Sequence, residues 1–140
     1  MAVYNKFETF VGDLGAAIHD LRAAGHTLEV YLTNAAPSAS LDSVKADLAE
    51  IATGFGYTGP VDIANDYTEA AGTGTLTGVD VVITAAGGSI GPFQYVVLQN
   101  TTPTSPLDPL IAWWDNGSAV TLADGESFTI DFGASVATIA

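Results

Sequence analysis

A serine flanked by glycines is one group whose type and spacing suggest catalysis. Gly87-Gly88-Ser89-Ile90-Gly91 matches the G-x-S-x-G pattern of a hydrolase nucleophile elbow. That motif needs a strand before it, a helix after it, and an Asp or Glu and then a His later in the chain. Here a strand-like run, Phe93–Gln99, follows the motif, and both histidines, His19 and His26, precede it. The segment therefore predicts a glycine turn between two strands and no catalytic residue.

A second glycine-rich segment suggests a dinucleotide site. Gly54-Phe55-Gly56-Tyr57-Thr58-Gly59 matches the G-x-G-x-x-G pattern. In a dinucleotide-binding fold this motif follows a strand and opens a helix, whose N-terminus holds the pyrophosphate. Here a helical pattern precedes the motif, and Pro60 and a short strand-like run follow it. A later Walker A loop is excluded because Lys45 is the last lysine, and we expect no cofactor.

The imidazole and carboxylate groups are too dispersed to predict a metal site. His19 and His26 are seven residues apart in a chain without cysteine, so a zinc site would need carboxylates from remote strands. We expect one histidine to be a partly buried hydrogen-bonding residue and the other to lie on the surface. Carboxylates at Asp62, Asp66 and Glu69 offer oxygen ligands, but they match no calcium-loop pattern. The sequence predicts no metal ligand.

Two adjacent tryptophans, Trp113 and Trp114, are candidates for binding. On a strand, neighbouring side chains point to opposite faces of the sheet. We therefore expect one indole to enter the core and the other to be exposed or to contact a partner. Burial at an oligomer or partner interface is the favoured interpretation. Sugar-binding modules use exposed aromatic rings, so a glycan ligand stays open as an alternative.

The composition fits one folded domain and excludes some partners. The 140 residues are enough for one core; 48% are hydrophobic, 14% are charged, and there is no cysteine. The formal net charge is -13, and all three basic residues lie in the first 45 positions. Nucleic-acid binding needs Lys and Arg to displace counterions from phosphates, so we expect no nucleic-acid partner. No apolar run approaches the ~20 residues of a membrane helix, so we expect no membrane partner. The first residues have no apolar signal region, and we expect synthesis in a cytoplasm without export by that route.

The first third of the chain has the pattern of short helices around one strand. Apolar residues at steps of three and four predict a helix over Lys6–Leu14. Strict alternation predicts a strand over Thr27–Asn34 with one buried face. A second helix is predicted over Val44–Ala52, with Asp42 or Ser43 as its cap.

From residue 56 onward the pattern is of short strands separated by turns. Asn116-Gly117 and Asp124-Gly125 predict tight hairpins, and Thr101–Pro109, with its three prolines, predicts a long loop. Such spacing is typical of an antiparallel β-sandwich or an open barrel. We expect one β-dominated α+β domain over residues 1–140, with one or two short helices in its N-terminal third. In it, a helix/strand/helix segment over residues 1–55 packs on a β region over residues 56–140. The expected strands are Val61–Ala64, Tyr67–Leu76, Val79–Ala85, Phe93–Gln99, Leu110–Asp115, Ala119–Leu122, Ser127–Phe132 and Ser135–Ile139.

Turn and core residues spread over most of the chain form a recognisable set. They include Tyr4-Asn5-Lys6-Phe7, Thr27-Leu28-Glu29-Val30, Leu48-Ala49-Glu50-Ile51-Ala52, Gly87-Gly88, Gly91-Pro92-Phe93 and Trp113-Trp114-Asp115. In these residues the chain resembles a family of small structural proteins of tailed bacteriophages and prophages. The shared positions are structural, and none of them belongs to an active site.

The resemblance implies a virion component that is not an enzyme. It implies a decoration or cement protein, which binds the outer surface of the assembled capsid and stabilises it. The alternatives are a head fibre, a tail or neck component, or a carbohydrate-binding adhesion module on the virion. The implied partners are the major capsid protein and copies of the chain itself, for example in a homotrimer, on the capsid exterior after synthesis in the host bacterial cytoplasm. The expected partner-contact residues are Val3, Tyr4, Lys6, Trp113 and Trp114.

Overall fold

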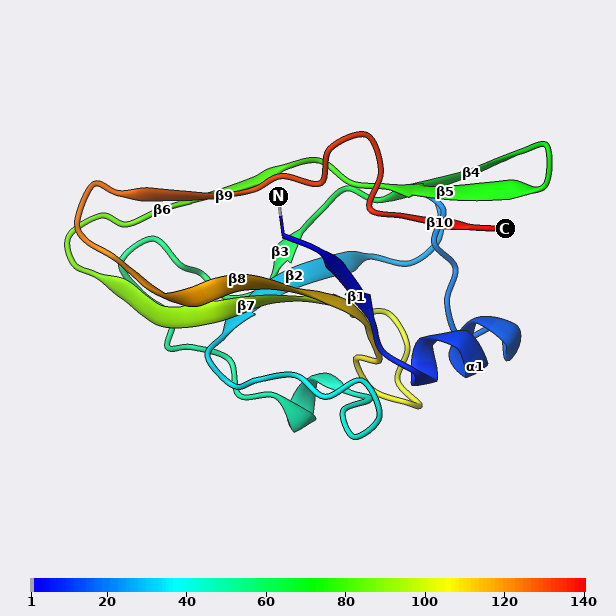
Figure 1. Ribbon diagram of the computed structural model, residues 1–140, viewed down its shortest axis with the longest axis horizontal. Helices are drawn as coiled ribbons and strands as arrows, with labels where there is room; N and C mark the ends of the chain where they lie inside the picture. Colours follow the sequence, from blue (N-terminus) through cyan, green and yellow to red (C-terminus); the bar gives the residue numbers. More distant parts are fainter. Residues whose placement is uncertain (1) are drawn as a thin grey trace.

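Two layers of antiparallel strands, a short helix and a layer of loops make up the structure, a computed structural model that describes residues 2–140 (Figure 1). This arrangement confirms the expected β-dominated α+β class and its sandwich-like form. The elements in chain order are β1 (Tyr4–Lys6), α1 (Thr9–Gly15), β2 (Leu28–Thr33), the 3-10 turn η1 (Lys45–Asp47), β3 (Val61–Asp62), β4 (Asp66–Ala70), β5 (Thr73–Thr77), β6 (Val81–Thr84), β7 (Ile90–Asn100), β8 (Leu110–Leu122), β9 (Ser127–Ile130) and β10 (Ala137–Ile139).

The larger layer is a five-stranded sheet with the order β1-β8-β7-β2-β3. All of its pairs are antiparallel. Tyr31 of β2 lies opposite Val97 of β7, which in turn lies opposite Trp113 of β8. The first 55 residues therefore supply two strands of the same sheet as the later strands β7 and β8.

The smaller layer is a long ribbon that changes register in the middle. β6 pairs with β9, with Val81 opposite Ile130, and β5 pairs with β10, with Leu76 opposite Ala137. Because the chain passes from β5 to β6 and from β9 to β10, the two pairs are consecutive parts of one ribbon. β4 adds a third strand at the edge of β5. Figure 1 shows this ribbon lying over the five-stranded sheet.

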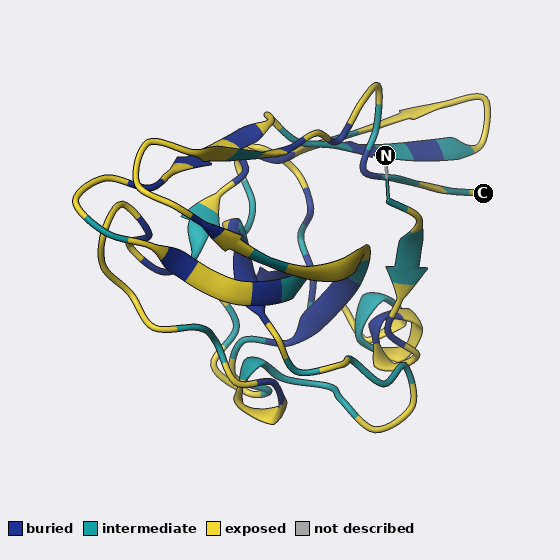
Figure 2. Cartoon of the chain, turned by 60° about the vertical axis from the view of Figure 1, so that its left-hand side comes forward, coloured by how far each residue is buried: buried dark blue, intermediate teal, exposed yellow. Residues whose placement is uncertain are grey.

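Apolar side chains are buried on both faces of the five-stranded sheet. The larger cluster lies between the two layers and includes Leu32, Phe93 and Leu98. The smaller cluster lies on the other face, beneath the loops. Figure 2 shows the buried stretches in the middle of the sheet and the exposed residues along the loops. The smaller cluster consists of Phe7, Tyr31, Leu48, Val97 and Leu110.

This second cluster changes two predictions about the N-terminal third. The prediction that β2 has one buried face is wrong, since Tyr31 and Thr33 on its other face are also buried. The predicted helix over Lys6–Leu14 is observed as α1, which begins later because Lys6 pairs with Ala112 of β8. No helix within residues 2–140 combines the length and apolar character needed to cross a membrane.

The predicted helix over Val44–Ala52 is wrong. Within that range only η1 is helical, and the chain after it is extended. The Ile51 amide donates a hydrogen bond to the Leu32 carbonyl at 3.0 Å, so the segment is held along the end of β2. The predicted cap is also replaced, because the Asp47 carboxylate accepts the Ser43 amide at 2.8 Å. Tertiary pairing here overrides a weak local preference for helix.

The predicted hairpin at Asn116-Gly117 is wrong as well. β8 is one strand of 13 residues that runs through this dipeptide. Its partner β7 is continuous, with Tyr95 opposite Asp115 and Phe93 opposite Val120. The intervening residues of β8 therefore form a bulge, and Gly117 takes up the positive φ of +87° there.

Two other turns complete the architecture. At Asp124-Gly125 the predicted turn is present, since the Glu126 amide donates to the Ala123 carbonyl at 2.9 Å. It is not a hairpin, because β8 and β9 belong to different layers. The predicted strand Tyr67–Leu76 is instead the hairpin β4–β5, which turns at Ala71 with a φ of +52°.

Candidate functional site

The five predicted contact residues lie together at one edge of the five-stranded sheet. Tyr4 of β1 pairs with Trp114 of β8, and Lys6 is two residues further along β1. Val3 and Lys6 are exposed, whereas Tyr4, Trp113 and Trp114 are half-buried. Burial raises the pKa of Tyr4. The structure thus brings residues 3–6 and residues 113–114, which are far apart in the sequence, to one β1–β8 edge.

The two indoles point to opposite faces of β8, as predicted. The Trp113 ring lies 4.6 Å from the Phe7 ring, beneath the loops. The Trp114 ring lies 5.9 Å from the ring of Tyr4 and 5.7 Å from that of Phe132, between the layers. Neither indole is fully exposed or fully buried, because loops cover one face of β8 and the ribbon overhangs the other. The alternative that one of them contacts a partner stays a prediction.

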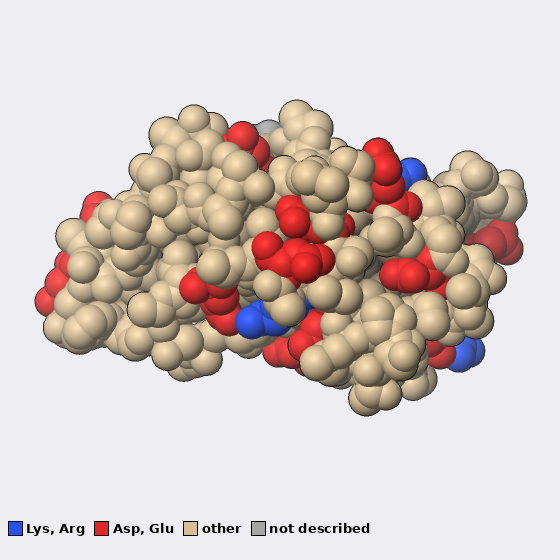
Figure 3. Space-filling view, turned by 90° about the horizontal axis from the view of Figure 1, so that it is seen from below, with Lys and Arg blue, Asp and Glu red and all other residues tan. Residues whose placement is uncertain are grey.

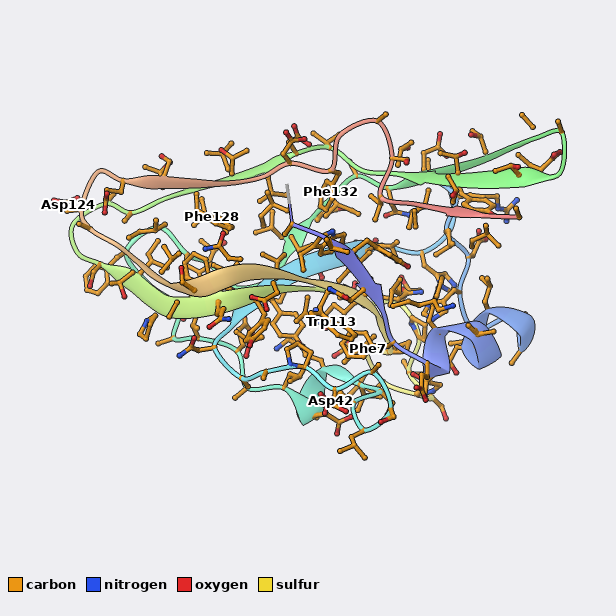
Figure 4. All side chains as sticks on the ribbon, in the orientation of Figure 1. Phe7, Asp42, Trp113, Asp124, Phe128 and Phe132 are labelled. Carbon is orange, nitrogen blue, oxygen red and sulfur yellow. The ribbon has the colours of Figure 1, made fainter. Side chains whose placement is uncertain are left out.

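An apolar cleft, here called the interlayer cleft, opens between β8 and β9. Its volume is about 410 Å³. Trp114 of β8 lines one side, and Phe128 and Ile130 of β9, followed by Phe132, line the other. Figure 4 shows Phe128 and Phe132 pointing from the ribbon toward the five-stranded sheet. The sequence did not predict this cleft, because its shape depends on how the two layers diverge.

A second hollow, here called the loop groove, lies in the layer of loops. Its volume is about 620 Å³, and it is lined by Val44, Lys45, Ala46, Leu48, Ala49, Pro106, Leu107 and Asp108. Val44, Leu48 and Pro106 supply much of its apolar wall. Leu107 at the groove is 62% exposed, and Leu41 in the same layer of loops is 81% exposed. We take the groove, with Leu107 at it, as a candidate contact surface.

Carboxylates gather on the side of the molecule that carries the loop groove, and Asp108 is one of the residues that line it. Figure 3 views this side of the molecule and shows acidic side chains near the middle of the face. The pKa of buried Tyr31 is raised, first by burial and then by four carboxylates. Lys45 is already engaged, with its Nζ atom 2.8 Å from Glu50 Oε1 and 5.1 Å from the centre of the Tyr31 ring. We call this surface, formed by residues 34–57 and 101–109, the loop face. Its four carboxylates are those of Asp42, Asp47, Glu50 and Asp108.

The two histidines converge on one amide. The Nδ1 atoms of His19 and His26 each lie 3.0 Å from Nδ2 of Asn100, at the end of β7. Burial, and then the neighbouring His26, lower the pKa of His19 to about 4. The prediction of one buried, hydrogen-bonded histidine is confirmed for His19. The prediction of a surface position for the other is wrong, since His26 is half-buried.

Both glycine motifs are turns, which for the segment around Ser89 confirms the prediction. Ser89 lies between β6 and β7, which belong to different layers, and no helix follows it. Gly54 and Tyr57 exchange two backbone hydrogen bonds, of 2.7 and 3.1 Å, in a tight turn. Within residues 2–140, no group of three or more His, Asp or Glu side chains is placed to hold a metal ion.

Comparison of the chain with models of protein families, with curated proteins and with solved structures finds no match. The loop face, the β1–β8 edge and the interlayer cleft are the surfaces on which a function can be based. The loop groove and the interlayer cleft were both missed at the level of sequence. The one local feature of the groove visible in the sequence is Leu107, an apolar residue within a proline-rich loop.

Proposed function

We propose that this chain is a non-enzymatic structural component of a tailed-phage head, a decoration or cement protein that binds the outer surface of the assembled capsid through its loop face. The observation that carries the proposal is the loop groove, an apolar hollow of about 620 Å³ on a face that carries four carboxylates. The resemblance of the sequence to virion proteins supports the choice of the major capsid protein as partner.

The chemistry of the loop face fits a basic surface that carries an apolar projection. Burying one exposed leucine such as Leu107 contributes about 1.5–3 kcal/mol, and Leu41 offers a second such contact. The surrounding carboxylates attract basic groups and orient the two partners as they approach. Lys45 is paired with Glu50. The loop face therefore presents little free positive charge that would repel such a partner.

Binding to an assembled shell stabilises that shell by mass action. A site that spans neighbouring capsid subunits exists only after assembly, so a protein that binds it favours the assembled state. A stable interface buries about 1,600 Å² in total. We expect the β1–β8 edge, with Val3 and Lys6 exposed beside it, to add contacts to the capsid or to a second copy.

The test is co-sedimentation of the purified chain with shells that lack it. The unchanged chain is expected to sediment in hundreds of copies per shell. Leu107→Lys is expected to lower that occupancy at least about tenfold, as the loss of one central apolar contact does in other interfaces. Val82→Lys is the matched control, because Val82 is also 62% exposed but lies on β6 of the ribbon, away from the loops.

Two results would contradict this function. Equal loss of binding by both variants would show that the loop face is not the contact surface. An image of the particle with the chain at the neck or tail, in few copies, would replace the decoration role by that of a tail or neck component.

A further inference from the structure

The bulge of β8 places an asparagine and a glycine outside the regular strand pairing. β7 pairs with β8 at Asp115 and again at Val120, so the four residues 116–119 of β8 face only Gln94 of β7. On the other edge of β8, the pairing with β1 ends at Trp114. Residues 115–119 are all exposed. The backbone of this segment is therefore held less firmly than the rest of β8.

The side chain of Asn116 lies along the backbone that follows it. Its Nδ2 atom donates a hydrogen bond to the Ser118 carbonyl at 3.3 Å, so the side-chain amide extends past the Gly117 peptide. Gly117 has a φ of +87°, and the side where a Cβ would stand is open space. The absence of a side chain at this residue leaves its amide nitrogen accessible to a neighbouring group.

We infer that Asn116 is a site of spontaneous conversion to aspartate and isoaspartate. The Gly117 amide gives its proton to hydroxide, and the nitrogen attacks Cγ of Asn116 to close a succinimide ring. Nδ2 takes a proton from water and leaves as ammonia, which regenerates the hydroxide. Water then opens the ring at either of its carbonyl groups. Water is the only co-reactant, because the nucleophile and the electrophile belong to adjacent residues.

Three of the other asparagines are held in ways that oppose this ring closure. Asn65 and Asn100 are buried, and the side-chain amide of each makes hydrogen bonds to neighbouring segments. Asn5 lies within β1, where the backbone is paired with Trp113. Extended, paired backbone keeps the next amide nitrogen away from the side chain, so we expect these three residues to be stable.

Asn34 is the matched comparison, because it is also exposed. The amide of the next residue, Ala35, donates to Thr33 Oγ1 at 3.0 Å. The Gly117 amide likewise donates to Asp115 Oδ1, at 2.7 Å. Thr33 is buried, whereas Asp115 is exposed, so water competes more readily for the bond at the bulge. Ala35 also has a Cβ, which hinders attack by its nitrogen.

The reaction changes the surface and leaves the fold in place. Either product adds a negative charge beside Asp115, at a residue that lines the interlayer cleft. Isoaspartate also lengthens the backbone by a methylene group, which the unpaired residues of the bulge have room to accommodate. The inference goes beyond the decoration role and does not depend on it, because the bulge is not part of the loop face.

The experiment is storage of the purified full chain at body temperature, at neutral and at mildly alkaline pH. Peptide mapping by mass spectrometry measures the conversion of each asparagine, and labelling by an isoaspartate methyltransferase identifies isoaspartate. Asn116 is expected to convert at least about tenfold faster than Asn34, the ratio given by ~1.4 kcal/mol in the barrier. Both products are expected, and the rate should rise with pH because hydroxide removes the amide proton.

Two variants and an unfolded reference complete the test. Asn116→Gln should abolish the labelling, because its longer side chain closes a ring less readily, and Asn34→Gln should leave the labelling unchanged. The rate at Asn116 in the folded chain should stay within about tenfold of its rate in the chain unfolded by urea. Three results would overturn the inference: Asn116 converts no faster than Asn34, aspartate forms without isoaspartate, or folding slows the reaction by more than that factor.

Discussion

Replacing His19 by asparagine should remove much of the acid sensitivity of this protein between about pH 6.5 and pH 4. The Asn100 amide group explains why. Its Oδ1 atom accepts the Thr102 amide at 3.2 Å, so its Nδ2 atom faces the rings and donates one hydrogen to each Nδ1. A proton on Nδ1 of buried His19 would oppose this donor, and the Nε2 atom of the same ring is buried without a hydrogen-bond partner in residues 2–140.

The magnitude follows from the pKa of His19. Burial, followed by the neighbouring His26, lowers this pKa from 6.5 to about 4. Between these values the unfolded chain binds more protons than the folded chain, so the free energy of unfolding falls as the pH falls. At ~1.4 kcal/mol per pKa unit, His19 alone removes about 2 kcal/mol by pH 5 and about 3 kcal/mol by pH 4. The contribution is fully present above pH 6.5.

The assay is urea unfolding of the unchanged chain and of His19→Asn at several pH values across this range. The Asn side chain has an oxygen near the position of Nδ1, so it can still accept from Asn100, but it does not titrate. We expect the free energy of unfolding of the variant to be nearly flat where that of the unchanged chain falls. Carboxyl groups whose pKa is lowered, such as those of Asp20 and Asp47, lose their contribution at lower pH. Equal slopes for the two proteins would refute the reasoning.

Two turns and one surface give further tests. Gly56→Ala is expected to lower the free energy of unfolding by about 3 kcal/mol, because its Cβ would clash with the Thr84 carbonyl oxygen at a φ of +105°. Gly54→Ala, with a φ of +127° but open space around it, is the control in the same urea titration and should cost about 1 kcal/mol. Ala71→Asn is expected to raise the melting temperature through a gain of about 1 kcal/mol, because its φ of +52° and the following Gly72 suit an Asn-Gly turn; a lower melting temperature would count against that turn geometry. Finally, if the carboxylates of the loop face attract the partner, raising the salt concentration should lower the amount of the chain that sediments with shells. Binding that does not change with salt would show that these charges do not contribute to it.

The sequence predicted strands best where alternation and turn residues agree. β2 and β7 appear within a few residues of their predicted bounds. The predicted strand bounds were wrong where pairing with a neighbouring strand sets the length of a strand. Asn116-Gly117 has the composition of a hairpin, but a continuous β7 holds both halves of β8. Ala71 was not recognised as part of a turn, because alanine rarely adopts a positive φ.

The layer of loops was the largest feature that local patterns could not predict. Val44, Leu48 and Ile51 have helical spacing, yet Leu48 is buried on the far face of the sheet and the Ile51 amide bonds to β2. A sequence window shows which residues are apolar, but it does not show which surface they will cover. The same reason explains why the sequence named the tryptophans as candidate contact residues but did not predict the cleft beside Trp114, since Phe128 and Phe132 reach that cleft from a separate layer.

The position of β1 beside β8 also has a consequence for folding rate. Asn5 and Trp113 lie 108 residues apart in the sequence, yet the Asn5 side chain donates a hydrogen bond to the Trp113 carbonyl. The pairing of β2 with β7 likewise joins segments that are distant in the sequence. Sheets dominated by such distant pairings fold slowly, because the entropy of closing a long loop is lost before any contact compensates for it. During synthesis, β1 therefore remains without its partner until β8 has left the ribosome, and β2 has only the short strand β3 to pair with until β7 follows. A nascent chain of this kind benefits from a chaperone until its last strands arrive.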